Sequence, residues 1–215
     1  MRSPDELDAV TVDALGTLVE LDDPIPRLRA ALAARGVARS DAKVASAFRA
    51  EATYYRSRLG DPGPWDDETV AALQRDCARV FLAALAAPLA PDEFAPAFVE
   101  TLRFRLADGA AEALVTLKRA GLALACVSNW DPTLHERLDE LGIASSFDAV
   151  VTSAEAGAAK PDPRIFRMAL ARLGVAPARA LHIGDSDADR EGASAAGVAF
   201  APTPLVTLPE RLGLE

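Results

Sequence analysis

Polar side chains that could do chemistry follow three short apolar runs of this chain. They are Asp13 after the first run, Ser128 and Asn129 after the second, and Asp185 and Asp189 after the third. An aspartate can act as a nucleophile, hydroxyl and amide groups can hold an anionic group, and carboxylate oxygens are ligands for a hard cation such as Mg²⁺. The sequence therefore suggests chemistry on an anionic substrate.

The three apolar runs must position these side chains. Residues 10–12 are all β-branched, which is typical of a strand buried on both faces, and Gly16 permits a sharp turn after them. Residues 122–127 and 180–183 are mostly apolar and also predict buried strands. The carboxyl ends of parallel strands meet at one edge of a sheet, where open α/β sheets place their sites. Lys160 precedes a proline on a connecting loop that could reach the same edge.

Carboxylates gathered at one edge need positive charge nearby. At about 4 Å and an effective dielectric constant of 20, each pair would repel by roughly 4 kcal/mol. The Lys160 ammonium and a divalent cation, in the first place Mg²⁺, would answer that need and would also neutralise a phosphate. Two simpler interpretations stay open: Asp13 could only form a turn, and the residues from Asp185 to Asp189 could only cap a helix.

The rest of the chain predicts two kinds of structure. Between Val19 and Leu122 the apolar residues recur with helical spacing, and we expect helices but no strand there. Beyond Asp108, helices alternate with strands, which include 149–152 and 198–200. We therefore predict an α/β fold with a doubly wound, mostly parallel five-stranded (Rossmann-like) sheet, in a core domain of residues 1–18 and 106–215. Residues 19–105 would form a helical cap subdomain inserted after the first strand, as a lid.

Composition excludes several classes of protein. The 215 residues are half apolar and carry a net charge of -9, without the Lys/Arg clusters that a nucleic acid or an anionic membrane surface would require. Only two cysteines occur, which favours a cytoplasmic location. The acidic N-terminus resembles no export signal, and the longest apolar run is too short to span a membrane. We expect a monomer or homodimer that acts on a small molecule.

Four motifs occur in order along the chain. They are D-A-L-G-T-L at Asp13, V-S-N at Val127, A-K-P-D-P at Ala159 and H-I-G-D-S-D-A-D at His182. This set resembles the haloacid dehalogenase-like hydrolase superfamily over the whole core, and the helical insertion is similar to the cap that this family carries between its first two motifs.

The resemblance implies a role for each matching residue. Asp13 would be the nucleophile that forms an aspartyl intermediate, and the transferring group would be held by Thr17, Ser128 and Lys160, with Asn129 as a further donor. The resemblance also implies a Mg²⁺ site, whose residues are Asp13, the backbone carbonyl of Leu15, Asp185 and, directly or through water, Asp189.

One position departs from the family's pattern. Phosphatases of this family have a second aspartate two residues after the nucleophile, as general acid and base, and this chain has Leu15 there. Substitute acids near the site by sequence are Glu20, Asp131 and Asp187. An apolar residue at this place is similar to the metal-independent dehalogenases of the family, whose halide pocket could use Arg27, Arg29, Arg56 or Arg58, although surface charge is the simpler interpretation of these arginines.

Three functions follow from this mixture. The first is a Mg²⁺-dependent phosphatase for a small phosphorylated metabolite, which retention of Asp185, Asp189 and Lys160 favours. The second is a 2-haloacid dehalogenase, and the third is a non-catalytic relative that binds a ligand or accepts a phosphoryl group; Leu15 favours these two. We expect His182 to be a hydrogen-bonded histidine of the core.

Overall fold

The computed structural model describes residues 6–61 and 63–214. The chain divides into two compact units. The first consists of Met1–Glu20, Gly60–Pro62 and Arg105–Glu215, and the second of Leu21–Leu59 and Gly63–Phe104. Each unit contains its own cluster of buried apolar side chains.

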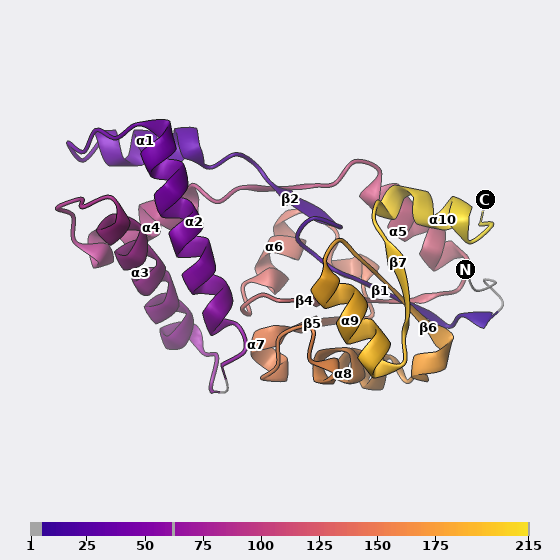
Figure 1. The fold of residues 1–215 in the computed structure, drawn as a ribbon. Helices are drawn as coiled ribbons and strands as arrows, with labels where there is room; N and C mark the ends of the chain where they lie inside the picture. Colours follow the sequence, from indigo (N-terminus) through magenta and orange to yellow (C-terminus); the bar gives the residue numbers. More distant parts are fainter. Residues whose placement is uncertain (1–5, 62, 215) are drawn as a thin grey trace. The chain divides into compact units, whose positions relative to one another are not determined.

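A five-stranded parallel sheet forms the centre of the first unit (Figure 1). Its strands lie in the order β5-β4-β1-β6-β7, and every pairing between neighbours is parallel. They are β1 (Ala9–Val12), β4 (Ala123–Ser128), β5 (Ala149–Thr152), β6 (Ala180–Gly184) and β7 (Ala199–Pro202). The central strands β1 and β6 are buried along their whole length because helices cover both faces of the sheet. The predicted doubly wound α/β fold is confirmed.

Helices α8 and α9 pack on one face of this sheet, where the side chains of Ala9, Ala125 and Val127 lie, and α5 and α10 lie on the other side (Figure 1). The helices of this unit are α5 (Ala110–Arg119), α6 (Leu134–Glu140), α7 (Ser153–Ala156), α8 (Pro163–Leu173), α9 (Asp187–Ala196) and α10 (Leu208–Arg211). Short 3₁₀ turns lie at η2 (Ala144–Ser146), η3 (Pro177–Arg179) and η4 (Leu205–Thr207).

Local sequence signals set the ends of the two helices that pack nearest the predicted site. Helix α8 begins with Pro163, and the preceding Asp162 caps it by accepting a hydrogen bond from a backbone N–H of the first turn. The helix ends at Gly174, which has the left-handed conformation. Helix α9 begins with a reciprocal capping box between Ser186 and Asp189. Because α9 starts just after β6, these capping residues lie at the carboxyl edge of the sheet.

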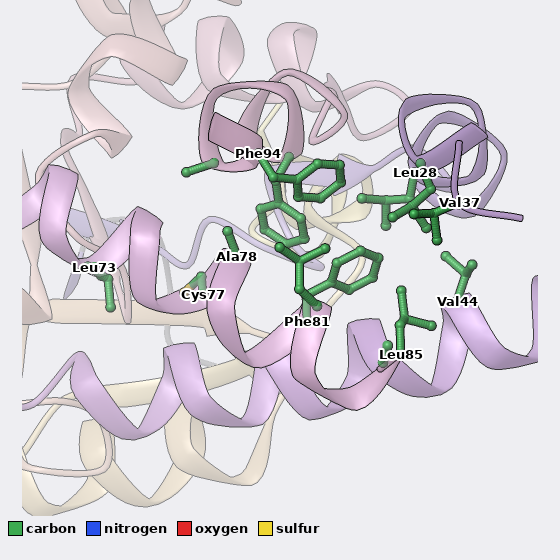
Figure 2. Packing of buried hydrophobic residues seen from close by; sticks show 14 residues of the cluster. Leu28, Val37, Val44, Leu73, Cys77, Ala78, Phe81, Leu85 and Phe94 are labelled. Atoms are coloured by element: carbon green, nitrogen blue, oxygen red, sulfur yellow. The ribbon is translucent and has the colours of Figure 1, made fainter. Parts of the chain in front are cut away.

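The second unit is helical. Its helices are α1 (Ile25–Ala33), α2 (Asp41–Arg58), α3 (Asp67–Ala84) and α4 (Pro91–Glu100). Their apolar faces meet in a core that includes Leu28, Val44 and Phe81, and Phe81 stacks on Phe94 with the ring centroids 6.0 Å apart (Figure 2). Within the described part of the chain, no helix combines the length and the apolar character that crossing a membrane requires.

A short two-stranded ribbon was not predicted. It pairs β2 (Val19–Leu21) with β3 (Phe104–Leu106), and the boundaries between the two units fall within these strands. The expectation of no strand between Val19 and Leu122 is therefore wrong. Strands of three residues are too short to show an alternating pattern, and a pairing between positions so far apart leaves no local signal.

Candidate active site

Asp13 follows the last residue of β1. Its N–H donates to the carbonyl of Ile183 at 2.9 Å, which keeps the backbone in line with β6. Its Oδ1 accepts hydrogen bonds from Ser128 Oγ at 3.2 Å and from Lys160 Nζ at 2.5 Å, whereas within residues 6–61 and 63–214 no hydrogen bond reaches Oδ2. One carboxylate oxygen is thus held by the protein, and the other is left for a ligand.

Lys160 is buried, and its ammonium uses all three of its protons. Nζ donates to Asp13 Oδ1 and to Asp189 Oδ1, each at 2.5 Å, and to the carbonyl of Val127 at 3.0 Å. Burial by itself would lower the pKa of Lys160, but the negative charges of Asp13 and Asp189 outweigh it, and the pKa lies above its usual value. Lys160 is therefore a fixed positive charge beside the free carboxylate oxygen.

Asp189 accepts four hydrogen bonds, which satisfy both of its oxygens. Oδ1 accepts from Lys160 Nζ and from His182 Nε2 at 3.0 Å, and Oδ2 accepts from Ser186 N at 3.1 Å and Ser186 Oγ at 2.5 Å. Although burial opposes ionisation, the hydrogen bonds from His182 and Lys160 hold the pKa of Asp189 well below its usual value. Asp189 thus caps α9 and anchors Lys160 at the same time.

Gly184 makes room for Asp189 at the end of β6. A Cβ atom on Gly184 would lie 2.4 Å from Asp189 Cγ, so any larger residue would push this carboxylate out of place. The glycine of the G-D motif is therefore needed for a close approach.

Asn129 follows β4 and clamps the backbone of Lys160. Its Nδ2 donates to the Lys160 carbonyl at 3.1 Å, and its Oδ1 accepts from the Lys160 N–H at 2.7 Å. Both ends of the amide are used in this clamp. In the structure Asn129 thus orients the lysine backbone, a contact that the sequence did not indicate.

Asp185 lies on the open side of the site. Its carboxylate passes over Gly16, where a Cβ atom would lie 2.4 Å from Asp185 Oδ2 and where φ is +89°. Asp185 is an exposed residue whose carboxyl is partly buried, and this partial burial and the charge of Asp189 raise its pKa; burial raises the pKa of Asp13 against the opposing pull of Lys160. The missing side chain at Gly16 therefore creates the space in which Asp185 approaches Asp13.

The charge and the donor atoms of this cluster fit a hard cation. Asp13, Asp185 and Asp189 each offer an oxygen, and these oxygens lie within 4.8 Å of one another. Of the three carboxylates, Lys160 contacts only Asp13 and Asp189, so Asp185 faces the site without that ammonium. Asp13 and Asp185 are the two whose oxygens are not all occupied by protein donors, which suits oxygen ligation of Mg²⁺.

Thr17 supplies an unused polar atom in the same loop. The residue is 2% exposed, and its Oγ1 has no hydrogen-bond partner among the described residues. A buried hydroxyl without a partner is costly to a fold, and its presence indicates a place for a ligand atom. The role of Thr17 in holding the transferring group stays a prediction.

Leu15 occupies the sequence position, two residues after Asp13, at which the family's phosphatases carry their acid. The residue is 46% exposed, and its side chain cannot transfer a proton. The carboxylates suggested as substitutes are engaged by neighbours: Glu20 pairs with Arg105, Asp187 pairs with Arg190 at 2.5 Å, and Asp131 accepts from Thr133 N at 2.8 Å.

Two of the arginines suggested for a halide pocket form hydrogen bonds or ion pairs with other residues of the helical unit. Arg27 donates to the carbonyls of Thr101 at 2.8 Å and Asp22 at 3.1 Å, and Arg29 pairs with Asp41 at 2.6 Å. Arg56 and Arg58 lie in the last turn of α2. The contacts of Arg27 and Arg29 are those of structural residues.

His182 and Thr11 are polar residues that the sequence left outside the site. They are paired neighbours in the register of β1 and β6, and Thr11 Oγ1 lies 2.8 Å from His182 Nδ1. Their signal in the sequence is a polar residue within an otherwise apolar run in each strand.

Comparison with known proteins gives consistent matches over this chain. The haloacid dehalogenase-like hydrolase family matches residues 7–197. The mouse haloacid dehalogenase-like hydrolase domain-containing protein 3 is 37% identical over 199 residues, which are 88% of this chain and 78% of the mouse protein. A phosphoserine phosphatase from Thermus thermophilus is 45% identical over 127 residues, 56% of this chain and 51% of that protein.

A solved structure with the same fold is an L-2-haloacid dehalogenase from Xanthobacter autotrophicus. It aligns with a TM-score of 0.67 and 26% identity, over 92% of this chain and 77% of that one.

Proposed function

The chain belongs to the haloacid dehalogenase-like hydrolase family, and from this premise we propose that it is a Mg²⁺-dependent phosphatase that acts on a small phosphorylated metabolite through Asp13. The observation that carries the proposal is the approach of the Asp185 carboxylate to Asp13 over Gly16, which gathers oxygen ligands beside the nucleophile. The similarity to a phosphoserine phosphatase supports the same reaction class.

Binding of the phosphoryl group would rest on three side chains. Lys160 would stabilise its negative charge, Ser128 Oγ lies 3.2 Å from Asp13 Oδ1, and Thr17 Oγ1 has no protein hydrogen bond within residues 6–61 and 63–214. A fixed cation and fixed donors stabilise developing charge more effectively than water, because they do not need to reorient during the reaction.

The nucleophilic step would use the free oxygen of Asp13. Oδ2 forms a bond to phosphorus while the bond from phosphorus to the ester oxygen breaks, and the leaving group departs with the electron pair of that bond. Water then hydrolyses the aspartyl phosphate, which releases phosphate and restores Asp13. Oδ1 stays bound to Lys160 and Ser128, which orients the attacking oxygen.

The residues that would hold Mg²⁺ are Asp13, the backbone carbonyl of Leu15 and Asp185. Asp189 would contribute indirectly, because its hydrogen bond with Lys160 keeps that ammonium in place. When bound, the ion supplies positive charge that shields the nucleophile and polarises the phosphoryl group.

Leu15 keeps a second candidate open, a hydrolase of 2-halo acids. In that reaction the leaving halide needs no proton, so the reaction does not require a general acid at this position. The similarity in fold to an L-2-haloacid dehalogenase agrees with this alternative. The presence of Asp185 favours the phosphatase, because a reaction that needs no metal would not require this carboxylate as a ligand.

A panel of phosphate esters and 2-halo acids, assayed with and without Mg²⁺, tests the proposal. We expect phosphate release that requires Mg²⁺ and no halide release. Halide release without Mg²⁺, together with no hydrolysis of any phosphate ester, would establish the dehalogenase. We also propose a cytoplasmic location, which the two buried cysteines support because both are thiols and not part of a disulfide.

A further inference from the structure

A continuous series of hydrogen bonds connects Thr11 of β1 with Asp13, the residue that follows β1. It runs from Thr11 Oγ1 to His182 Nδ1 at 2.8 Å, and from His182 Nε2 to Asp189 Oδ1 at 3.0 Å. It continues from Asp189 Oδ1 to Lys160 Nζ and from Lys160 Nζ to Asp13 Oδ1, and each of these two distances is 2.5 Å. Thr11 and Asp13 are two residues apart, and the backbone of Asp13 continues the line of β1, so their side chains lie on the same side of the sheet.

His182 occupies the middle of this series and has no access to solvent. The residue is 0% exposed, and its ring forms a T-shaped pair with Phe166, with the ring centroids 4.8 Å apart. Both ring nitrogens have a partner within the protein. The ring therefore cannot rotate without breaking two buried hydrogen bonds, each of which is costly to lose.

The partners of the ring fix the direction of these hydrogen bonds. Asp189 is an ionised carboxylate that also accepts from Lys160, so it can only accept, and His182 Nε2 must carry the proton. The hydroxyl of Thr11 can serve either as donor or as acceptor toward Nδ1. The donation from Nε2 to Asp189 thus exists whether the ring is neutral or protonated.

The shared acceptor links His182 to the lysine. Asp189 Oδ1 receives both the His182 N–H and one of the Lys160 protons, while Oδ2 is held by Ser186. Without the histidine, Oδ1 would lose one of its two donors. Because Nζ already lies 2.5 Å from Oδ1, the Asp189 carboxylate and the ammonium would then shift together. Any such movement draws Nζ away from Asp13 Oδ1.

We propose that His182 is a positioning residue that, through Asp189, holds the Lys160 ammonium against the nucleophile Asp13. The catalytic part of this inference rests on the proposed hydrolase function, whereas the placement of the ammonium does not. His182 touches neither the substrate nor the reacting atoms, and its effect is transmitted by one hydrogen bond.

Three variants separate positioning from packing. His182→Leu removes the donor and leaves an apolar side chain of similar size, while His182→Gln keeps an N–H that can reach Asp189. Leu181→Ala is the matched control, because Leu181 is a buried neighbour on β6 whose side chain points to the opposite face of the sheet.

Turnover is the first measurement. With a phosphate ester that the wild type hydrolyses, His182→Leu should lower kcat by about 10- to 100-fold with a smaller change in KM, and His182→Gln should recover most of the loss. Assays are run below the melting temperature of every variant. Equal losses of kcat in His182→Leu and Leu181→Ala would overturn the catalytic part of the inference.

A measurement without substrate tests the placement itself. In a ¹H–¹⁵N spectrum that selects lysine ammonium groups, Lys160 should give a slowly exchanging signal, identified by its absence in Lys160→Met. This signal should broaden or shift in His182→Leu and persist in His182→Gln and Leu181→Ala. An unchanged signal in His182→Leu would overturn the positioning role even if the protein hydrolysed none of the esters, an outcome that would count separately against the proposed function.

Discussion

Replacement of Glu51 by glutamine should remove a loss of stability that the protein undergoes as the pH rises. Glu51 lies on the buried face of α2, is 5% exposed and shares a hydrogen bond with Cys77 of α3. Burial raises the pKa of this carboxyl from 4.5 to about 7, against smaller opposing effects of Cys77 and Arg56. The folded protein therefore keeps the Glu51 proton at pH values where the unfolded chain has lost it.

The sign and size of the effect follow from the two pKa values. A carboxyl whose pKa is raised by folding favours the folded state while both states are protonated, and this contribution is lost as the pH rises from the unfolded value to the folded one. For Glu51 the loss begins near pH 4.5 and is complete above pH 7. Between about pH 5 and about pH 8 it amounts to about 2 to 3 kcal/mol.

Urea unfolding followed by circular dichroism measures this effect in the wild type, in Glu51→Gln and in the control Glu100→Gln. Glu100 is exposed at the end of α4, in the same unit. The free energy of unfolding of Glu51→Gln, relative to wild type, should increase by about 2 to 3 kcal/mol between about pH 5 and about pH 8. The corresponding difference for Glu100→Gln should stay constant within about 0.5 kcal/mol. A difference for Glu51→Gln that does not vary with pH would refute the reasoning.

Three further predictions concern the open side of the site. Mg²⁺ at about a hundred times its dissociation constant should stabilise the wild type by about 2.7 kcal/mol; Asp185→Asn should abolish most of the rise in melting temperature, and an equal rise in both proteins would exclude this ligand. Gly16→Ala should destabilise the fold by about 1–2 kcal/mol, because φ is +89° there, and should also remove the Mg²⁺ response by displacing Asp185; thermal melts that show an unchanged response would contradict this. Leu15→Asp should raise kcat for alkyl phosphates more than for p-nitrophenyl phosphate, within the ~10²–10⁴-fold range of a general acid, and equal gains on both substrates would argue against a proton-donor role at this position.

The sequence was sufficient to predict the sheet because the information is local. Apolar runs, prolines at helix starts and glycines at helix ends specify the strands and most helix boundaries, as Asp162 and Gly174 show for α8. The contact between Asp13 and Lys160 could also be expected, because Asp13 follows a strand at the carboxyl edge of the parallel sheet and the loop that carries Lys160 can reach that edge.

Other contacts depend on long-range register that a single sequence does not contain. The pairing of Thr11 with His182 needs the alignment of β1 with β6, and the clamp of Asn129 on Lys160 needs the path of a loop 31 residues away. The buried position of Glu51 was also hidden, because a charged residue on a helix is usually solvated. The ribbon of β2 and β3 was missed for the same physical reason as the clamp.

Identification of a phosphorylated Asp13 during turnover tests the central claim most directly. A reacting mixture of the protein, Mg²⁺ and the best phosphate ester of the panel is quenched in acid and reduced with borohydride, which converts an aspartyl phosphate into homoserine. Peptide mass spectrometry should then find homoserine at position 13 in the wild type, and no turnover or reduction product in Asp13→Asn. Full turnover by Asp13→Asn, or homoserine at another aspartate, would contradict the assignment of Asp13 as the nucleophile.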